Sequence, residues 1–373
     1  MWERPEVGLL TVSKAQRGHV KPISSAVRTG LWRLGSFRGF MPYNFARLFS
    51  AIVVLMFAAF PSSADARADE PRPVRLDVGG VKLNSILINA GRKADLPPIV
   101  FIHGASTSLY DPMFSFRAKL EGRADLLFVD RPGHGASDAG NPQMILPDEQ
   151  ADTIARLMKK RGIGKAIIVG HSFGGAIAAA LAVRHPENVA GLVFLSPAVY
   201  SWQGGVAWYY DAAAIPVTGP LFSTFIAPPA GLLAIDRATQ AVFWPNHRPV
   251  NYVRETEAVQ ALRPAAFRHN AMEVAGLSNW AKTASLQYKS IRAPTVIITG
   301  DADKIVSPDV HARHLSRDVS GATLVVVRNL GHKSDYVASD LAIEAIKKVA
   351  GYKSNLAAVR KTIEKRIAVD GER

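Results

Sequence analysis

The chain has 373 residues, no cysteine and a formal net charge of +14 at pH 7. Its length allows one large α/β domain with an insertion or two domains, and the absence of cysteine excludes disulfides and thiolate metal sites. Much of the positive charge lies at the two ends of the chain. This is more typical of solvated tails, or of attraction to an anionic membrane, than of a nucleic-acid interface, so we expect no nucleic-acid partner.

The N-terminal extension, residues 1–68, is basic and contains an apolar run of thirteen residues, 48–60. This run is shorter than the roughly 20 residues of a spanning helix and fits the core of a signal peptide. Small-residue cleavage patterns follow it at 64–66 and 66–68, and Met41 as the true start would give a compact signal peptide. We therefore expect an exported protein, periplasmic or secreted. A membrane anchor, with membrane association through this segment, is the first alternative, and a structural helix in a cytoplasmic protein is the less favoured one.

The region after the extension predicts alternating strands and helices. Short apolar runs predict strands at 74–78, 81–89, 99–102 and 126–130. Gly79-Gly80 is expected to turn the first two strands into a hairpin. Helices are predicted around 114–120 and over 148–161, where Asp148 can cap the helix and Gly162 ends it.

The stretch Gly170–Gly174 organises the rest of the chain. It has the pattern Gly-x-Ser-x-Gly, with an apolar strand at 166–169 before it and an alanine-rich helix at 176–182 after it. A strand that turns at once into a helix forces a strained bend, which exposes the Oγ of Ser172. The backbone N–H of Phe173, at the helix N-terminus, then supplies half of an oxyanion hole. The alternative is a glycine-rich turn with an ordinary serine.

The strand–helix alternation stops after one more strand, at 189–195. From 198 to 292 the chain is rich in aromatic residues and proline, with helices plausible at 237–243 and 250–262. We interpret this segment as a helical insertion over the carboxyl edge of the sheet. A second core is the alternative. Strands at 293–300 and 323–327, helices near 310–315 and from Tyr336, and a basic tail after Gly351 complete the predicted elements.

Candidate partners for Ser172 follow two later strands. Asp301 and Asp303 come after the strand that ends at Thr299, and His332 comes after the strand that ends at Val327. Ligand-facing residues of an open parallel sheet lie at the carboxyl ends of its strands, so these groups are expected to meet. His332 would take the proton from Ser172, and a carboxylate would orient the imidazole.

These motifs together resemble the α/β-hydrolase fold superfamily. The resemblance covers roughly residues 74–350 and rests on His103-Gly104, Asp130–Asp138, Val169–Gly175, Gly300–Val306 and Gly331-His332. It implies an α/β fold: a mostly parallel, eight-stranded sheet with helices on both faces and a helical cap. The expected domains are a core of 69–197 and 293–350, a cap of 198–292 and a basic C-terminal tail of 351–373.

The resemblance also implies roles for single residues. The family pattern Gly-x-x-Asp selects Asp303 as the triad acid and leaves Asp301 to order the turn. The second oxyanion N–H would come from Ala105. His103, His134 and His171 are interpreted as structural, and we expect four further histidines to be surface groups: His247, His269, His311 and His314. No metal-ligand spacing and no nucleotide-binding glycine motif is present, so no metal or other cofactor is implied.

The function expected on these grounds is that of a serine hydrolase that cleaves an ester, or a related acyl bond, of a small apolar substrate through an acyl-enzyme. Three alternatives remain. The same triad can hydrolyse carbon–carbon bonds, with arginines of the insertion binding a substrate carboxylate. It can also transfer an acyl group to an alcohol. The third alternative is a protein that binds a ligand on this fold without turning it over. A serine in the nucleophile position argues against epoxide hydrolases and haloalkane dehalogenases, which the family resemblance associates with an aspartate nucleophile.

Overall fold

A computed structural model describes residues 71–371 of the chain. The chain divides into two units, residues 1–67 and 68–373, and the second unit contains everything described below. The basic extension 1–68, its apolar run 48–60 and the two cleavage patterns lie outside the described residues. What we expect of them therefore remains a prediction.

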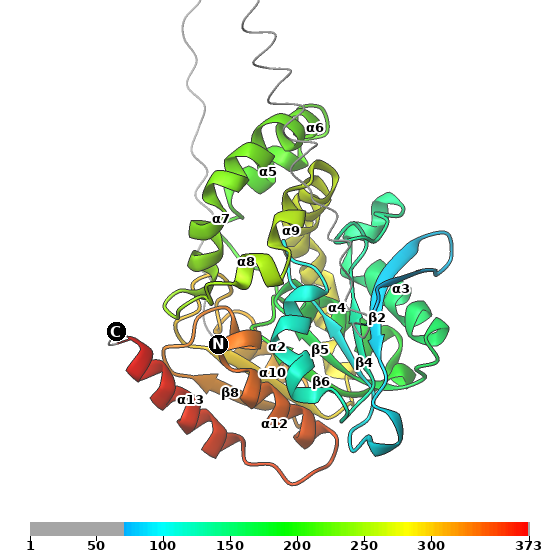
Figure 1. Ribbon diagram of the computed structural model, residues 1–373, viewed down its shortest axis with the longest axis vertical. Coiled ribbons are helices and arrows are strands. Elements are labelled where there is room, and N and C mark those ends of the chain that lie inside the picture. Colours follow the sequence, from blue (N-terminus) through cyan, green and yellow to red (C-terminus); the bar gives the residue numbers. More distant parts are fainter. Residues whose placement is uncertain (1–70, 372–373) are drawn as a thin grey trace, which may run out of the picture. The chain divides into compact units, whose positions relative to one another are not determined.

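One eight-stranded sheet forms the centre of the described domain, with strand order β1-β2-β4-β3-β5-β6-β7-β8 (Figure 1). β1 and β2 form an antiparallel hairpin, β2 runs antiparallel to β4, and all later neighbours are parallel. The strands are β1 (Val74–Asp77), β2 (Lys82–Ile88), β3 (Ile99–Ile102), β4 (Leu126–Val129), β5 (Ala166–His171), β6 (Val189–Leu195), β7 (Thr295–Gly300) and β8 (Thr323–Val327). The predicted strands and the mostly parallel sheet are confirmed.

Two apolar layers cover the faces of the sheet, because the central strands are apolar at successive positions. In β3, Val100 and Ile102 join one buried cluster, whereas Ile99 and Phe101 join the other. The first layer includes α3 (Pro147–Lys160), α4 (Phe173–Arg184) and α10 (Ala312–Asp318). The second includes α2 (Tyr110–Leu120), α12 (Ser339–Val349) and α13 (Leu356–Gly371). Short turns complete this part: η1 (Gly91–Lys93), η2 (Pro142–Ile145), η3 (Pro186–Asn188) and α11 (Ser334–Val337).

The chain between β6 and β7 is a helical insertion. It consists of α5 (Trp208–Ala214), α6 (Gly219–Leu221), the π-helical turn η4 (Phe222–Ile226), α7 (Ala227–Phe243), α8 (Tyr252–Glu255), η5 (Ala258–Leu262), α9 (Pro264–Ala284) and η6 (Ser285–Ser290). Figure 1 shows α5 and α6 at the end of the described domain farthest from the sheet.

Several predicted helix boundaries were wrong. Asp148 does not cap α3, because Pro147 occupies the first helical position and Leu146 precedes it without a side-chain cap. α7 begins ten residues earlier than predicted, at Ala227. The predicted helix 250–262 is two short pieces, because Glu257 adopts a left-handed conformation with φ of 49° and interrupts it.

Among residues 71–371, no single helix is both long enough and apolar enough to span a bilayer. Trp208–Ala214 and Gly219–Phe243 reach that length and composition only when taken together, and they are bent by 118° relative to each other.

Candidate active site

Ser172 lies in a strained turn between β5 and α4. Its φ of 54° and ψ of −117° are rarely adopted by a residue with a side chain. The turn is held on both sides by backbone hydrogen bonds. Ser172 N–H donates to the carbonyl of Leu195 at 3.0 Å, and the Ser172 carbonyl accepts from the N–H groups of Gly175 at 2.9 Å and Ala198 at 3.1 Å. The surrounding structure therefore maintains the strain.

The two motif glycines are required by close backbone approaches. A Cβ on Gly170 would lie 2.5 Å from the carbonyl oxygen of Gly174. A Cβ on Gly174 would lie 2.2 Å from the carbonyl oxygen of Ile102, at the end of β3. Without side chains here, α4 packs directly against the strands and presents its N-terminus beside Ser172.

Asp303 and His332 meet at the ends of β7 and β8. His332 Nδ1 lies 2.8 Å from Asp303 Oδ2, and the other carboxylate oxygen accepts from the N–H groups of Ile305 and Val306 at 2.9 Å each. Burial disfavours the charge of Asp303, but the nearby His332 and these hydrogen bonds outweigh it and lower the pKa of the carboxyl group. A charged Asp303 accepts a hydrogen bond from Nδ1–H of His332, which leaves Nε2 without a proton and able to act as the base.

Asp301 has a different role in the same loop. It is exposed, and its Oδ1 accepts a hydrogen bond from the N–H of Asn329 at 2.7 Å. The structure thus brings Asp303 to His332, whereas Asp301 links the loops that follow β7 and β8.

His332 is held next to the Ser172 turn through His171. The two imidazole rings are 4.9 Å apart, and His171 Nε2 lies 3.0 Å from the His332 carbonyl oxygen. Burial lowers the pKa of His171, and the nearby Lys333 charge lowers it further, so His171 is neutral and donates from Nε2 to this carbonyl. This contact anchors the loop of the candidate base to the residue that precedes the candidate nucleophile.

The loop that contains Ala105 lies against the same turn. A Cβ on Gly104 would be 3.3 Å from Ser172 Cβ and 3.1 Å from His171 Nδ1. Ala105 follows Gly104, and Phe173 is the first residue of α4. The two backbone N–H groups expected to bind an oxyanion therefore belong to segments that flank Ser172.

The insertion contacts both loops of the candidate site. Asn270 of α9 accepts from the N–H of Ser106 at 2.7 Å, and the hydroxyl of Tyr210 in α5 lies 3.1 Å from that of Ser106. On the other side, Asn246 accepts from the N–H of Gly331 at 2.9 Å. The insertion therefore helps to position both loops, through α5 and α9 at Ala105 and through the segment between α7 and α8 at His332.

A buried ion pair connects the insertion to the core. Glu273 of α9 accepts from Arg131 Nη1 at 2.9 Å and lies 2.7 Å from His134 Nε2. Arg131 also donates to the carbonyl of Gly104 at 3.1 Å and lies 4.6 Å from the ring centroid of Phe173. Burial opposes the charge of Glu273, but Arg131 and His134 outweigh it and hold the pKa of the carboxyl group well below its usual value.

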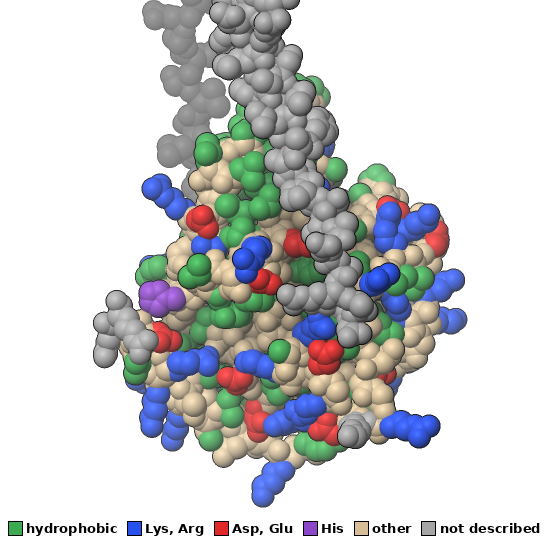
Figure 2. Space-filling model, viewed as in Figure 1, with side chains coloured by type: hydrophobic (Ala, Val, Ile, Leu, Met, Phe, Trp, Pro, Cys, Tyr) green, Lys and Arg blue, Asp and Glu red, His purple; other side chains and the backbone are tan. Residues whose placement is uncertain are grey.

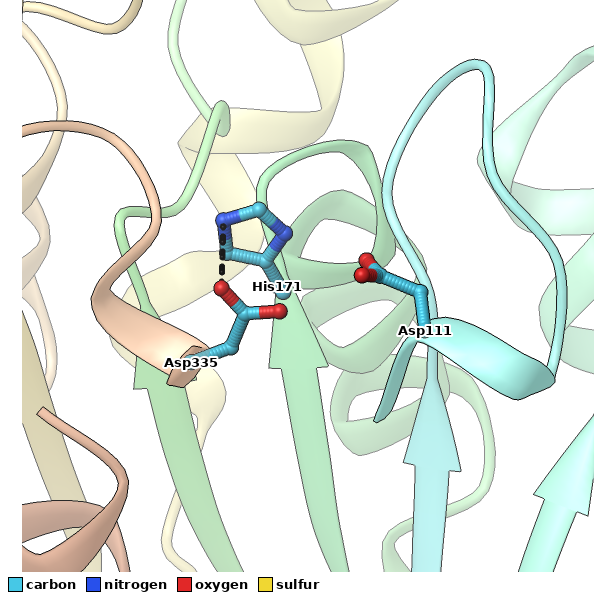
Figure 3. Close-up of side chains that lie close together, drawn as sticks. All are labelled: Asp111, His171 and Asp335. Carbon is cyan, nitrogen blue, oxygen red and sulfur yellow. Dashed lines mark ion pairs between the residues drawn. The ribbon is translucent and has the colours of Figure 1, made fainter. Parts of the chain in front are cut away.

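Three buried side chains beneath the site could in principle ligate a metal: Asp111, His171 and Asp335. Their ligand atoms all lie within 4.8 Å of one another, and His171 Nε2 is 3.6 Å from Asp335 Oδ1. Figure 3 shows this pair, with Asp111 on the other side of the imidazole. Lys333 Nζ lies 2.8 Å from carboxylate oxygens of both Asp111 and Asp335. The group therefore already contains a cation, and burial of Lys333 is outweighed by the two carboxylates, which raise its pKa.

Two of the histidines expected on the surface are buried instead. His269, on α9, lies 3.4 Å from Glu273. His311 Nδ1 accepts from the N–H groups of Val199 and Tyr200, so it is part of the packing after β6. Sequence reasoning failed here because the partners that bury these rings lie far along the chain: the ring of His269 is 6.0 Å from that of His134, and His311 binds residues that follow β6. The other two histidines of that group, His247 and His314, are exposed.

The expected scaffold role of His103 agrees with its contacts. Its Nε2 accepts from the N–H of Arg131 at 3.1 Å, and its Nδ1 lies 2.8 Å from the Gly104 carbonyl. The charged residues beside the site were not recognised in the sequence: Lys333, Asp111, Asp335, Arg131 and Glu273. The one usable signal was the position of Lys333, directly after the candidate base His332.

Comparison with known proteins gives consistent matches. A family model described as alpha/beta hydrolase fold matches residues 97–334. The dihydrolipoyllysine-residue acetyltransferase component of the acetoin cleaving system of Cupriavidus necator is 26% identical over 348 residues, 89% of this chain and 80% of that protein. The 2-(acetamidomethylene)succinate hydrolase of Mesorhizobium japonicum is 27% identical over 294 residues, 76% of this chain and 97% of that protein.

Among solved structures, a hydrolase from Pseudomonas aeruginosa PA01 matches with a TM-score of 0.59 at 20% identity, covering 76% of this chain and 100% of that one. An enol-lactonase from Burkholderia xenovorans LB400 matches with a TM-score of 0.57 at 20% identity, covering 74% and 100%. At this level of identity the two structures support the shared fold alone.

Proposed function

Because this chain belongs to the alpha/beta hydrolase fold family, we propose that it is a serine hydrolase that cleaves an ester, or a related acyl bond, of a small apolar molecule. The proposed catalytic residues are Ser172, His332 and Asp303. One observation carries the proposal: the buried pair of Asp303 and His332 is anchored beside the strained Ser172 turn. The hydrolases among its relatives support enzymatic activity in general.

In the proposed first half-reaction, Ser172 Oγ attacks the substrate carbonyl carbon while His332 Nε2 takes the hydroxyl proton. Asp303 holds the imidazole and stabilises its cation. The N–H groups of Phe173 and Ala105 bind the developing oxyanion. His332 then returns its proton to the leaving alcohol, and an acyl-enzyme on Ser172 remains.

In the second half-reaction, His332 removes a proton from water, and the resulting hydroxide attacks the acyl carbon. The tetrahedral intermediate collapses when His332 protonates Ser172 Oγ, which releases the carboxylic acid and restores the serine. The same two N–H groups stabilise both tetrahedral intermediates.

The apolar substrate class is supported by the residues of the insertion that contact the site loops. Tyr210 packs against Phe267 with ring centroids 6.5 Å apart, and its hydroxyl lies beside Ser106, next to the proposed oxyanion donor. We propose that the insertion acts as a cap that excludes water from Ser172, which strengthens the electrostatic stabilisation of the oxyanion.

Active-site labelling tests this proposal. A fluorophosphonate should react with the wild-type chain and with Ser201→Ala, a serine variant away from the strained turn, but not with Ser172→Ala. If folded wild-type protein is not labelled, or if Ser172→Ala is labelled equally, the proposal is wrong. A series of p-nitrophenyl esters of increasing acyl length would then define the apolar pocket.

Acyl transfer is the second candidate reaction, because the relative from Cupriavidus necator is named as an acetyltransferase component. Transfer would use the same acyl-enzyme, with an alcohol or thiol in place of water in the second half-reaction. Adding an alcohol acceptor to the ester assay separates the two reactions. A transferase forms the new ester and releases its first product faster, whereas a hydrolase forms the free acid at an unchanged rate.

The cellular location of the protein is proposed from the sequence, in which the apolar run 48–60 precedes small-residue cleavage patterns. We propose that the protein is exported, or anchored by this run if it is not cleaved. N-terminal sequencing of the mature protein distinguishes these outcomes, because cleavage near Ala66 or Ala68 removes the run and an intact extension retains it.

A further inference from the structure

The insertion exposes large apolar side chains to an extent that a stable soluble surface does not require. Six of them, from α5 to α7, are between 54% and 91% exposed. We call this group the apolar patch, and its members are Trp208, Val217, Leu221, Phe225, Ile226 and Leu233. Single exposed apolar residues are ordinary, but a concentration of them marks an interaction site.

Five of the six patch residues, all except Trp208, lie in a stretch of sequence without charged side chains. From residue 212 to residue 235, twenty-four consecutive positions lack any Asp, Glu, Lys or Arg, and the polar side chains are limited to Thr218, Ser223 and Thr224. Half-exposed Tyr209 comes shortly before this segment, and its ring lies 6.1 Å from that of Trp208 in the patch. Amphipathic aromatic residues at the edges of an apolar surface are typical of the membrane–water interface.

The apolar patch belongs to the elements that lie farthest from the sheet. Figure 1 shows α5 and α6 at that end of the described domain, and Figure 2 shows apolar side chains gathered over the same region. Within the described domain, α5 packs chiefly against α9. Within the described residues, the exposed side chains of α5 to α7 are therefore not covered by another apolar element.

We propose that the apolar patch docks on the surface of a lipid bilayer, with its side chains inserted below the headgroups. Such insertion buries apolar helix surface to a depth of about 5–10 Å and needs no complementary groove. No charged side chain of residues 212–235 would have to leave water when the patch enters the headgroup region, so insertion carries no charge-desolvation cost over this stretch. The apolar run 48–60, only ten residues before the described domain begins at residue 71, is consistent with function at a membrane.

This inference goes beyond the proposed hydrolysis and does not depend on it. The test can therefore use the full chain with Ser172→Ala, so that no vesicle lipid is consumed. Because the chain contains no cysteine, a single L233C substitution allows an environment-sensitive fluorophore to be attached inside the apolar patch. L286C is the matched control, since Leu286 is also an exposed leucine, at 77%, but lies in η6 outside the patch.

Vesicles of phosphatidylcholine with phosphatidylglycerol are added to each labelled chain. The fluorophore at 233 should shift to the blue and be quenched by spin-labelled lipid, whereas the fluorophore at 286 should report water throughout. Leu233→Asp should weaken vesicle binding about tenfold relative to Leu286→Asp if the patch provides the main contact, because one leucine of buried surface is lost.

Three results would overturn the proposal. The chain could fail to sediment with vesicles at all. It could sediment while position 233 stays in water, which would mean that another segment makes the contact. Finally, the fluorophore at 233 could become shielded without lipid as the protein concentration rises, in which case the patch pairs with a second copy of this chain.

Discussion

The backbone of Ser172 explains why the candidate site was recognisable residue by residue. A positive φ at a serine is unfavourable, and neighbouring glycines are needed because Cβ atoms at Gly170 and Gly174 would collide with backbone oxygen atoms. Because these constraints involve neighbouring residues, they appear in the sequence as the Gly-x-Ser-x-Gly pattern. The requirements around Lys333 act between distant segments, which bring Asp111 and Asp335 to its ammonium group, and no local pattern records those.

The choice between the two carboxylates of the loop after β7 leads to a prediction at this scale. Asp303→Asn should lower kcat about a thousandfold or more, because a neutral amide neither selects the required tautomer of His332 nor stabilises its cation. Asp301→Asn is the control. Its side-chain oxygen can still accept from the N–H of Asn329, so kcat should stay within about threefold of wild type.

Steady-state kinetics on a p-nitrophenyl ester measure both variants. Comparable losses in the two would contradict the assignment of Asp303. A loss in Asp301→Asn alone would transfer the role of the triad acid to Asp301.

At the scale of whole elements, strands were easier to predict than the helices of the insertion. Strands β3 to β8 are short, largely apolar runs with glycine or proline close to their ends, and such runs have few alternative structures. The less apolar strands β1 and β2 were recognised from the Gly79-Gly80 turn between them. α9 was missed because its buried face combines apolar residues with His269, Asn270 and Glu273, which obscures the apolar period. Those polar residues are buried because they contact core residues such as Ser106 and Arg131. The sequence of α9 alone does not reveal these partners.

The attachment of α9 to the core gives the second prediction. Glu273→Ala should lower the free energy of unfolding by about 3–5 kcal/mol, because it leaves the buried guanidinium of Arg131 without its carboxylate. The double variant Arg131→Met/Glu273→Leu should recover most of this loss, since it removes both charges and retains apolar volume. Asp309→Ala, which breaks an exposed pair with Arg313, should cost less than about 1 kcal/mol.

Urea unfolding followed by tryptophan fluorescence provides these values. If Glu273→Ala is no more costly than Asp309→Ala, the buried pair does not hold α9 to the core. If the double variant is as unstable as the single one, the loss comes from packing or from the carbonyl of Gly104 and not from an unpaired charge.

For the molecule as a whole, the sequence was sufficient to predict the sheet and the meeting of its loops, but not the path of the insertion. In a parallel sheet the carboxyl ends of the strands share one edge, so Ser172, Asp303 and His332 were expected to lie close together once their strands were identified. No comparable rule predicts where the helices of an insertion lie. Its contacts with Ser106 and Gly331 depend on Asn270 and Asn246, whose positions could not be read from helix propensity.

Buried histidines give the whole molecule a stability that depends on pH in mild acid. Burial is the main reason that the pKa values of His134 and His311 are each lowered from 6.5 to about 4. Between these values the unfolded chain binds more protons than the folded one. The free energy of unfolding should therefore fall as the pH drops from about 6.5 towards 4, by about 1–3 kcal/mol for each such histidine.

His311→Asn tests this dependence, because asparagine does not titrate and its side-chain oxygen can replace Nδ1 as the acceptor for the N–H groups of Val199 and Tyr200. Between pH 7 and pH 5 this variant should lose about 2 kcal/mol less stability than wild type does. Exposed His314→Asn should follow the wild-type curve. Urea titrations at the two pH values measure the difference, and a His311→Asn curve parallel to wild type would mean that His311 becomes protonated in the folded state as readily as in the unfolded chain.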